Sequence, residues 1–302
     1  MKSTNSIAGI LTAFVVLCVV LTIASRSFLT PNNVLNVFQQ ISTNFIIAIG
    51  MTFIILLGGI DLSVGSTVAF SGLIMGLLMK SLGMPVAVAL LIGLVCASAI
   101  GFFNGFLITF FKLPPFIATL GTMSIVRGAA YTITGGQPIY TFPQGFAMIT
   151  GRVAGIPIFT ILIMVVLFVI AAYVLKYTKY GRYIYAIGGN ENCAKLSGVN
   201  VGKVKCIAYV ISGFCCGVAA IVLTSRLDSA VPTNADGAEL DAIAAVVIGG
   251  TSMEGGEGVL VGTIIGALII GVVANGMNLL NVPQGAQRMV KGMIIVIAVI
   301  VD

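Results

Sequence analysis

A glycine-rich stretch that carries hydroxyl groups and one carboxylate lies between two apolar runs near the N-terminus. It reads GGIDLSVGS from Gly58 to Ser66, with apolar residues from Ile41 to Leu57 before it and from Thr67 to Met79 after it. A carboxylate between apolar runs is costly in hydrocarbon, so it must face protein or a water-filled path. Backbone amides freed by glycine at membrane depth need the same surroundings. Asp61 is therefore the first candidate for a functional residue.

A similar pattern recurs in the C-terminal third of the chain. The apolar runs Phe45 to Leu57 and Leu240 to Ile248 are each too short to cross a bilayer, which takes about 20 residues. The second run leads into GGTSMEGGEG, from Gly249 to Gly258. Short, glycine-interrupted segments in corresponding positions predict two related halves with a path between them. The pattern leaves open whether the halves are parallel or inverted.

The composition is typical of a membrane protein with several helices. Hydrophobic residues make up 59% of the 302 residues and charged residues 8%, and the mean hydropathy is +1.15. Soluble domains usually contain about 25% charged residues. Long apolar runs favour helices over a β-barrel, whose strands alternate over about ten residues. We predict one all-α domain over residues 1–302, a polytopic membrane protein of about ten transmembrane helices.

The lengths of the apolar runs predict the individual elements. Ser27 to Asn44 is expected to form an external loop with a short helix, because polar residues and Pro31 interrupt it. Thr67 to Met79 should complete a span-like pair with the half-segment before it. The predicted spans are Ile7–Ala24, Val86–Phe111, Phe116–Ile133, Ile158–Leu175, Cys206–Leu223, Val259–Ala274 and Met289–Val301.

The longest polar linker, Lys176 to Lys205, contains six of the fifteen basic residues, which predicts a cytoplasmic location. Ten spans with both chain ends inside place this linker after the sixth span, on the same side. Within it, a helix of about two turns is predicted outside the bilayer, and so short a helix needs support from a packing partner. Another protein or its own membrane domain could provide it. The residues that predict this helix are Asn190 as N-cap, Glu191 in the first turn, Ala194, Lys195 and Leu196 as helix formers, and Gly198 at the exit.

Several kinds of chemistry have no residues to support them. The phosphate-binding pattern GxxxxGK[ST] is missing, so the chain is not expected to hydrolyse ATP. Histidine is absent, and the six cysteines form no CxxC pattern, which argues against a metal or redox site. No nucleophile with a base is evident, so no catalytic residue is assigned, and the concentrated basic charge does not indicate nucleic-acid binding. A self-powered carrier would place acids and histidines within its spans and is less favoured.

Three long motifs resemble those of the ribose-type permeases of bacterial ABC sugar importers. They are the segment Asn36 to Ser66 ending in GGIDLSVGS, the linker GRYIYAIGGNE starting at Gly181, and ELDAIAAVVIGGTS starting at Glu239. The resemblance runs from about Pro31 to Asp302, in the same order. It implies the ABC importer permease fold in the bacterial inner membrane.

The resemblance also implies partners and roles. The permease would form a homodimer, with a separate cytoplasmic ATPase that uses ATP and Mg²⁺, and an external or periplasmic sugar-binding protein; the chain itself would bind no cofactor. The solute would be a monosaccharide such as ribose, or another sugar, a nucleoside or a signalling furanose. The segment from Asn190 to Gly198 would be the coupling helix that docks on the ATPase. Residues bordering the path or its gates would be Asp61, Ser63, Ser66, Asp241, Thr251 and Ser252.

Overall fold

The computed structural model describes residues 2–153 and 155–301, and its regular structure over these ranges is helical apart from two short strands. One two-stranded antiparallel sheet pairs Ile139 with Ala230 and Tyr140 with Ser229. The elements in chain order are α1 (Lys2–Ala24), α2 (Pro31–Ile55), α3 (Val64–Lys80), α4 (Val86–Phe110), α5 (Pro115–Thr134), β1 (Ile139–Tyr140), α6 (Gln144–Ala147), α7 (Ile158–Tyr177), α8 (Lys179–Gly189), α9 (Glu191–Leu196), α10 (Val201–Leu227), β2 (Ser229–Ala230), α11 (Ala238–Ile248), α12 (Leu260–Leu279) and α13 (Gln284–Val301).

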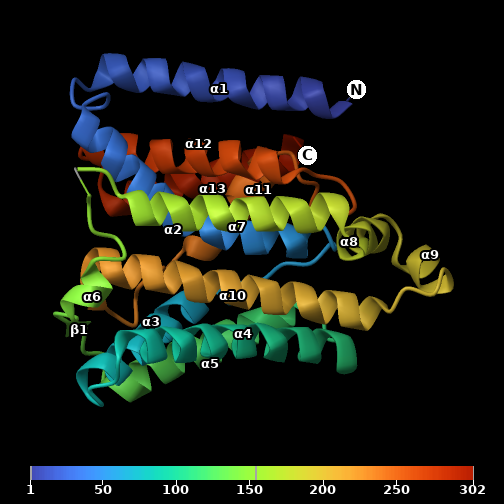
Figure 1. The fold of residues 1–302 in the computed structure, drawn as a ribbon. Helices are drawn as coiled ribbons and strands as arrows, with labels where there is room; N and C mark the ends of the chain where they lie inside the picture. The colour runs from blue at the N-terminus through green and yellow to red at the C-terminus, as the bar shows by residue number, and fades with distance from the viewer. Residues whose placement is uncertain (1, 154, 302) are drawn as a thin grey trace.

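The long helices run roughly parallel to one another and form one bundle (Figure 1). Both chain ends lie at the end of the bundle from which α8 and α9 project, and β1 and α6 lie at the opposite end (Figure 1). The basic linker assigns the α8–α9 end to the cytoplasm. This arrangement agrees with the predicted topology, in which both chain ends and the linker share one side.

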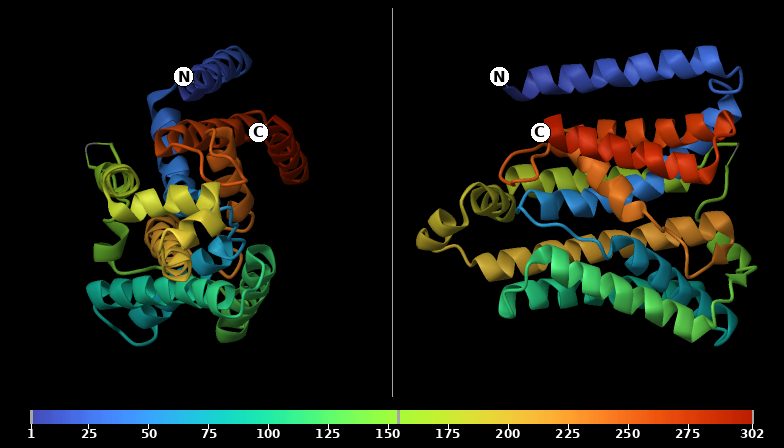
Figure 2. Two further views of the ribbon diagram at one scale, coloured as in Figure 1. Left: turned by 90° about the vertical axis from the view of Figure 1, so that its right-hand side faces the viewer. Right: turned by 180° about the vertical axis from the view of Figure 1, so that it is seen from behind.

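The centre of the bundle is formed by α2, α10 and α12, most of whose residues are buried, whereas most residues of α4, α5 and α7 are not buried. Seen end-on, α1 lies at one edge of the bundle and α8 crosses the cytoplasmic end (Figure 2). The close approach of α4 and α10 depends on glycine: a Cβ on Gly101 would meet Tyr209 O, and one on Gly213 would meet Ala97 O. Small residues allow membrane helices to pack in this way.

The predicted external loop from Ser27 to Asn44 and half-segment from Phe45 to Leu57 are wrong. Most of both ranges belongs to α2, a continuous helix of 25 residues that is long enough to span a bilayer. Its polar side chains find partners in distant parts of the chain: the Asn33 amide bonds Asn275, and Gln39 Nε2 donates to Thr150 O. These tertiary hydrogen bonds allow a polar sequence to remain helical inside the bundle.

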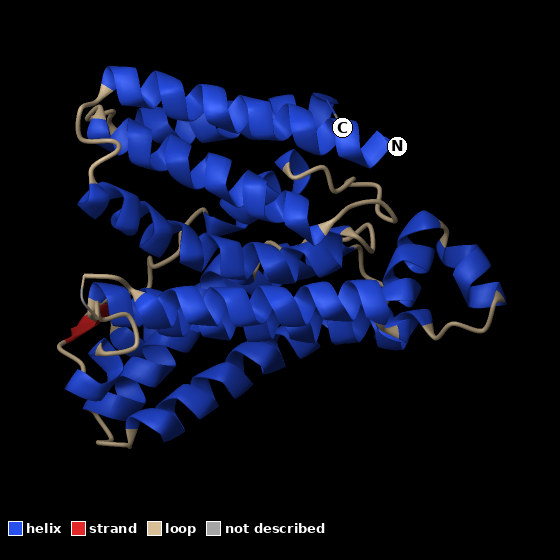
Figure 3. Cartoon of the chain, turned by 45° about the horizontal axis from the view of Figure 1, so that its top comes forward, coloured by secondary structure: helices blue, strands red, loops and turns tan. Residues whose placement is uncertain are grey.

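Consequently, the two glycine-interrupted regions differ in what precedes them. The helix before the second region, α11, has 11 residues and is short as predicted, whereas α2 is not. Six helices of the described chain are long and apolar enough to cross a membrane, and α1, α3, α11 and α13 lie beside them. The predicted number of about ten is therefore approximate. Over the residues that the structure describes, the chain consists of helices and loops with one small sheet at the external end of the bundle (Figure 3).

Candidate functional site

The predicted cytoplasmic helix is present as α9, which projects beyond the bundle (Figure 1). The Asn190 side chain accepts a hydrogen bond from Cys193 N at 2.9 Å, as expected of an N-cap, and Gly198 has a φ of +83° beyond the helix end. A second helix, α8, precedes it and was not predicted. Thr178 caps α8 by accepting from Gly181 N, and Asn190 alone separates α8 from α9.

The side chains of α9 point in opposite directions. Ala194 is buried against the chain, whereas Leu196 is 89% exposed. Glu191 forms an ion pair of 2.6 Å with Lys205 at the start of α10, which ties the helix to the bundle. Lys195 is exposed beside Leu196. An exposed leucine on a projecting helix is a surface suited to contact with another protein.

Cys193 provides a direct test of this topology. It is exposed at the projecting end, whereas Cys215 and Cys216 are buried and Cys18, Cys96 and Cys206 are partly buried. A membrane-impermeant maleimide should therefore modify the chain in inside-out vesicles and leave it mostly unmodified in intact cells. Cys193→Ser is the control and should lose the reaction. Strong labelling of intact cells at Cys193 would contradict the assigned orientation.

Asp61 lies in a buried polar network between α3, α4 and α10. Its Oδ1 accepts from Ser63 N at 2.9 Å and from Ser63 Oγ at 2.7 Å, and its Oδ2 accepts from Ser212 Oγ at 3.2 Å. Asn104 Nδ2 donates to Ser63 Oγ at 2.8 Å, and Ser66 Oγ donates to Ser63 O at 2.8 Å. The network holds the segment that enters the bundle before α3.

Asp61, Ser63 and Ser66 are thus brought together, and each is at most 2% exposed. Asn104 was not among the predicted residues, although an amide within the apolar Val86–Phe111 run was a signal for it. In this conformation of the single chain, none of the three predicted residues faces open space. Their place along a transport path stays a prediction.

Asp241 belongs to a different polar cluster, at the start of α11. Its Oδ2 accepts from Lys291 Nζ on α13 at 2.7 Å and from Asn44 Nδ2 on α2 at 3.3 Å. Glu239, two residues earlier, has its Oε2 against Gly65, where a Cβ would meet it. The cluster therefore lies next to the start of α3, close in space to the segment that carries Asp61.

Arg127 completes this region from α5. Its Nη1 donates to the carbonyl oxygens of Pro232 at 2.5 Å and Asn234 at 3.0 Å, both in the loop before α11. Arg127 lies within the apolar run from Phe116 to Ile133, and its contacts show that it holds this loop. The basic residues of α13 also have acidic partners here, because Arg288 pairs with Asp236 at 3.0 Å.

The two ion pairs of α13 are expected to differ in their contribution to stability. The Lys291–Asp241 side chains are 28% and 10% exposed, and the Arg288–Asp236 side chains are 78% and 56% exposed. Breaking a buried pair costs about 3–5 kcal/mol and an exposed pair about 0–1 kcal/mol, and the partly exposed Lys291 pair should lie between these. Lys291→Ala should therefore lower the unfolding temperature in detergent by several degrees, with Arg288→Ala as the matched control near the wild-type value. Equal effects would contradict this ranking.

Thr251 and Ser252 lie in the loop between α11 and α12, at the cytoplasmic end. Thr251 is fully buried, and its Oγ1 has no hydrogen-bond partner among the described residues. Ser252 N donates to Glu257 O at 3.0 Å, and Ser252 Oγ accepts from Glu254 N at 3.3 Å, which closes the loop into a compact turn. The six predicted path residues therefore lie in three places and do not form one binding site.

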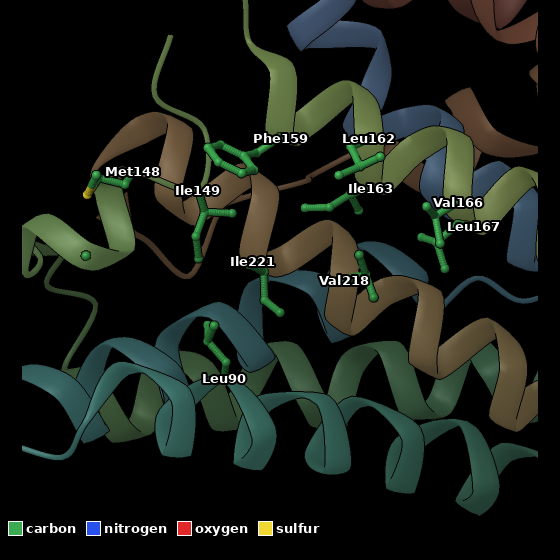
Figure 4. A pocket seen from close by; sticks show the side chains of 11 residues that line it. Leu90, Met148, Ile149, Phe159, Leu162, Ile163, Val166, Leu167, Val218 and Ile221 are labelled. Atoms are coloured by element: carbon green, nitrogen blue, oxygen red, sulfur yellow. The ribbon is translucent and has the colours of Figure 1, made fainter. Parts of the chain in front are cut away.

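A cavity of about 650 Å³ lies between α7 and α10. Figure 4 shows its lining, which includes Leu90, Phe159, Leu162, Val218 and Ile221 and carries no charged side chain. A sugar placed here would lose hydrogen bonds to water without finding replacements. This cavity is therefore not a sugar-binding site.

Comparison with known proteins identifies the family to which this chain belongs. Residues 33–299 match the family described as "Branched-chain amino acid transport system / permease component". The chain belongs to this family. The match therefore covers nearly the whole helical bundle, including α8 and α9. No solved structure matches the chain.

Three relatives illustrate the similarity within the permease family. The chain is 45% identical to the ribose import permease protein of Haemophilus influenzae, over 96% of this chain and 91% of the relative. It is 47% identical to the ribose import permease protein of Bacillus subtilis, over 95% and 89%. The D-allose transport system permease protein of Escherichia coli is 40% identical, over 91% and 84%. The family description names amino acids and these relatives name sugars, so family membership alone identifies a permease and not its solute.

Proposed function

We propose that the chain is the transmembrane subunit of a binding-protein-dependent ABC importer that moves ribose across the bacterial inner membrane. The observation that carries this proposal is the 45–47% identity to ribose import permeases over about 95% of the chain. The α8–α9 projection supports it, because it offers a contact surface on the side where ATP is available. Neither the bundle nor its loops carry the GxxxxGK[ST] pattern, so a partner supplies ATP hydrolysis with Mg²⁺.

The proposed assembly contains two copies of this chain, a cytoplasmic ATPase and an external ribose-binding protein. The coupling helix docks on the ATPase through Asn190, Glu191, Lys195, Leu196 and Gly198, while Ala194 packs inward. ATP binding draws the ATPase halves together and moves the coupling helices. The dimer then opens outward to accept ribose from its binding protein, and hydrolysis resets it.

The proposed transport path lies between the two copies and is gated by the polar segments described above. One gating segment carries Asp61, Ser63 and Ser66. A second, at the start of α11, carries Asp241, and the α11–α12 loop carries Thr251 and Ser252. A neutral polyol needs hydrogen-bond partners and no countercharge, which suits hydroxyl groups and backbone amides. The buried Oγ1 of Thr251 has no hydrogen-bond partner within the described ranges, which supports a change of conformation at this loop in which the hydroxyl gains a partner.

Reconstitution tests the proposal. The chain, its ATPase and the ribose-binding protein in liposomes should accumulate labelled ribose only when ATP is present on the ATPase side. Allose with its own binding protein is the alternative solute, suggested by the 40% identical relative. Allose uptake without ribose uptake would transfer the assignment to that sugar. Uptake by the chain without the ATPase would overturn the proposal in favour of a self-powered carrier.

A further inference from the structure

Three glycine-containing segments that are far apart in the sequence meet at the cytoplasmic end of the bundle. They are the end of α2 with Gly58, the end of α8 with Gly188, and the α11–α12 loop with Gly255 and Gly256. Gly256 N donates to Leu56 O at 2.9 Å, so the first and third segments share a backbone hydrogen bond. We call the contact of Leu56, Gly58, Gly188, Gly255 and Gly256 the glycine joint.

The joint consists of backbone packed against backbone. A Cβ on Gly188 would meet Leu56 O and Gly256 N, and a Cβ on Gly256 would meet Gly189 N at 2.6 Å. A Cβ on Gly255 would lie 2.7 Å from Gly58 N. Gly58, Gly255 and Gly256 also have φ values of +70°, +90° and +76°, which other residues rarely adopt. No side chain therefore separates the three segments.

Two further contacts hold α8 in this place. Tyr185 Oη donates to Gly258 O at 3.0 Å, which joins α8 to the α11–α12 loop a second time. Tyr180 Oη donates to Val204 O at 3.0 Å and joins α8 to α10. Ile184 and Ile187 on the same face of α8 are buried. A tyrosine hydroxyl is protonated at neutral pH at its ordinary pKa, and burial raises the pKa of Tyr185 further, so its hydroxyl is available as a donor.

The joint lies between the projecting helix and the segments that carry the predicted path residues. On one side, α8 continues into α9 through Asn190 alone. On the other side, Leu56 is five residues before Asp61, and Gly255 is three residues after Ser252. Backbone contacts cannot absorb a displacement by changing rotamers, and close-packed interiors transmit small shifts.

We propose that the glycine joint passes movement of the coupling helix to both the Leu56–Ser63 segment and the α11–α12 loop, with Gly188 and Tyr185 as positioning residues. This inference rests on the proposed function, because it assigns the route by which ATP-driven movement reaches the path. Docking of the ATPase uses the exposed surface of α9 and does not require the joint. The joint therefore separates attachment of the ATPase from coupling.

Adjacent glycines provide a matched pair of variants. Gly188→Ala introduces a methyl group into the joint, whereas a Cβ on Gly189 would have nothing within 4 Å. Both positions lie at the end of α8, so the change in helix propensity from glycine to alanine is similar in the two variants. In liposomes with the ATPase and ribose-binding protein, the ratio of ribose accumulated to ATP hydrolysed should fall about tenfold for Gly188→Ala, within the 5–150-fold range typical of coupling between sites. Gly189→Ala should keep the wild-type ratio, and both variants should co-purify with the ATPase as the wild type does.

Tyr185→Phe tests the joint without adding volume, and decides the question if Gly188→Ala does not fold. It removes one hydrogen bond and should lower the ribose-to-ATP ratio several-fold at unchanged co-purification. A wild-type ratio in Tyr185→Phe and in any folded Gly188→Ala would overturn the inference, as would equal loss in Gly189→Ala. Loss of ATPase co-purification in these variants would also overturn it, because the effect would then be on docking. If the wild-type assembly does not import ribose, the proposed function fails, and that result is separate from any difference among the variants.

Discussion

Leu196→Asp is expected to abolish most ATP-driven uptake while leaving the chain folded in the membrane. Leu196 is 89% exposed on α9, so replacing it removes few contacts within the chain. In a docked complex the same position would be covered by the ATPase, and an unpaired carboxylate buried there is costly. Each 1.4 kcal/mol lost from the docking free energy weakens ATPase binding about tenfold. Ribose uptake should therefore fall about tenfold or more.

The measurement compares ribose uptake in cells with co-purification of the ATPase. Leu196→Met is the matched control, because it keeps an apolar side chain of similar size and should retain both. Maleimide labelling at Cys193 in inside-out vesicles confirms that the variant inserts correctly. Wild-type uptake by a correctly inserted Leu196→Asp chain would refute docking through this surface of α9.

Asp61→Ala is expected to lower both the stability of the protein and its transport rate. Asp61 accepts three hydrogen bonds in the buried network, from Ser63 N, Ser63 Oγ and Ser212 Oγ. Each buried donor left without an acceptor costs about 1–3 kcal/mol. The unfolding temperature in detergent should therefore fall by several degrees, and ribose uptake should decrease because the segment before α3 loses its attachment.

Two further variants distinguish a role of Asp61 in holding the segment before α3 from a direct role in the transport path. Asp61→Asn keeps an oxygen acceptor in a side chain of the same shape and should recover most of the lost stability. Ser98→Ala on α4 is the control, because Ser98 Oγ donates to Leu94 O in its own helix and to no other partner in the described part of the chain. If Asp61→Ala stops uptake at an unchanged unfolding temperature, the attachment role is wrong and Asp61 acts on the solute or gate.

The division of α9 into an anchored and an exposed side shows how far local rules extend. Asn190 was predicted as the N-cap because capping depends on residues within one turn, and the structure has this bond. Which of Ala194 and Leu196 is buried depends on how α9 packs against the bundle. The residues within one turn of α9 do not determine that packing. The helix α8 was missed for a similar reason: its apolar positions are mixed with basic ones, and it is held by Gly258 and Val204 in distant segments.

The error in α2 has the opposite origin. Its first half is rich in amides, which taken alone indicate an external loop. Those amides are paired with Asn275, Thr150 and Asp241, all more than 100 positions away. Satisfied polar groups can be buried at little cost, so the tertiary partners make the helix possible. Such partners cannot be inferred from spacing along one segment.

The amino-acid sequence by itself determined that this protein is a helical membrane protein, because hydropathy, length and basic charge act segment by segment, and its three motifs added the resemblance to permeases. It also located the glycine-interrupted regions and the projecting helix, whose signals are local. Only the tertiary structure decided that Asp61 accepts a hydrogen bond from Ser212, that Asp241 pairs with Lys291, and that Gly188 meets Gly256. These contacts join residues that are distant along the chain, and their geometry follows from how the helices pack together.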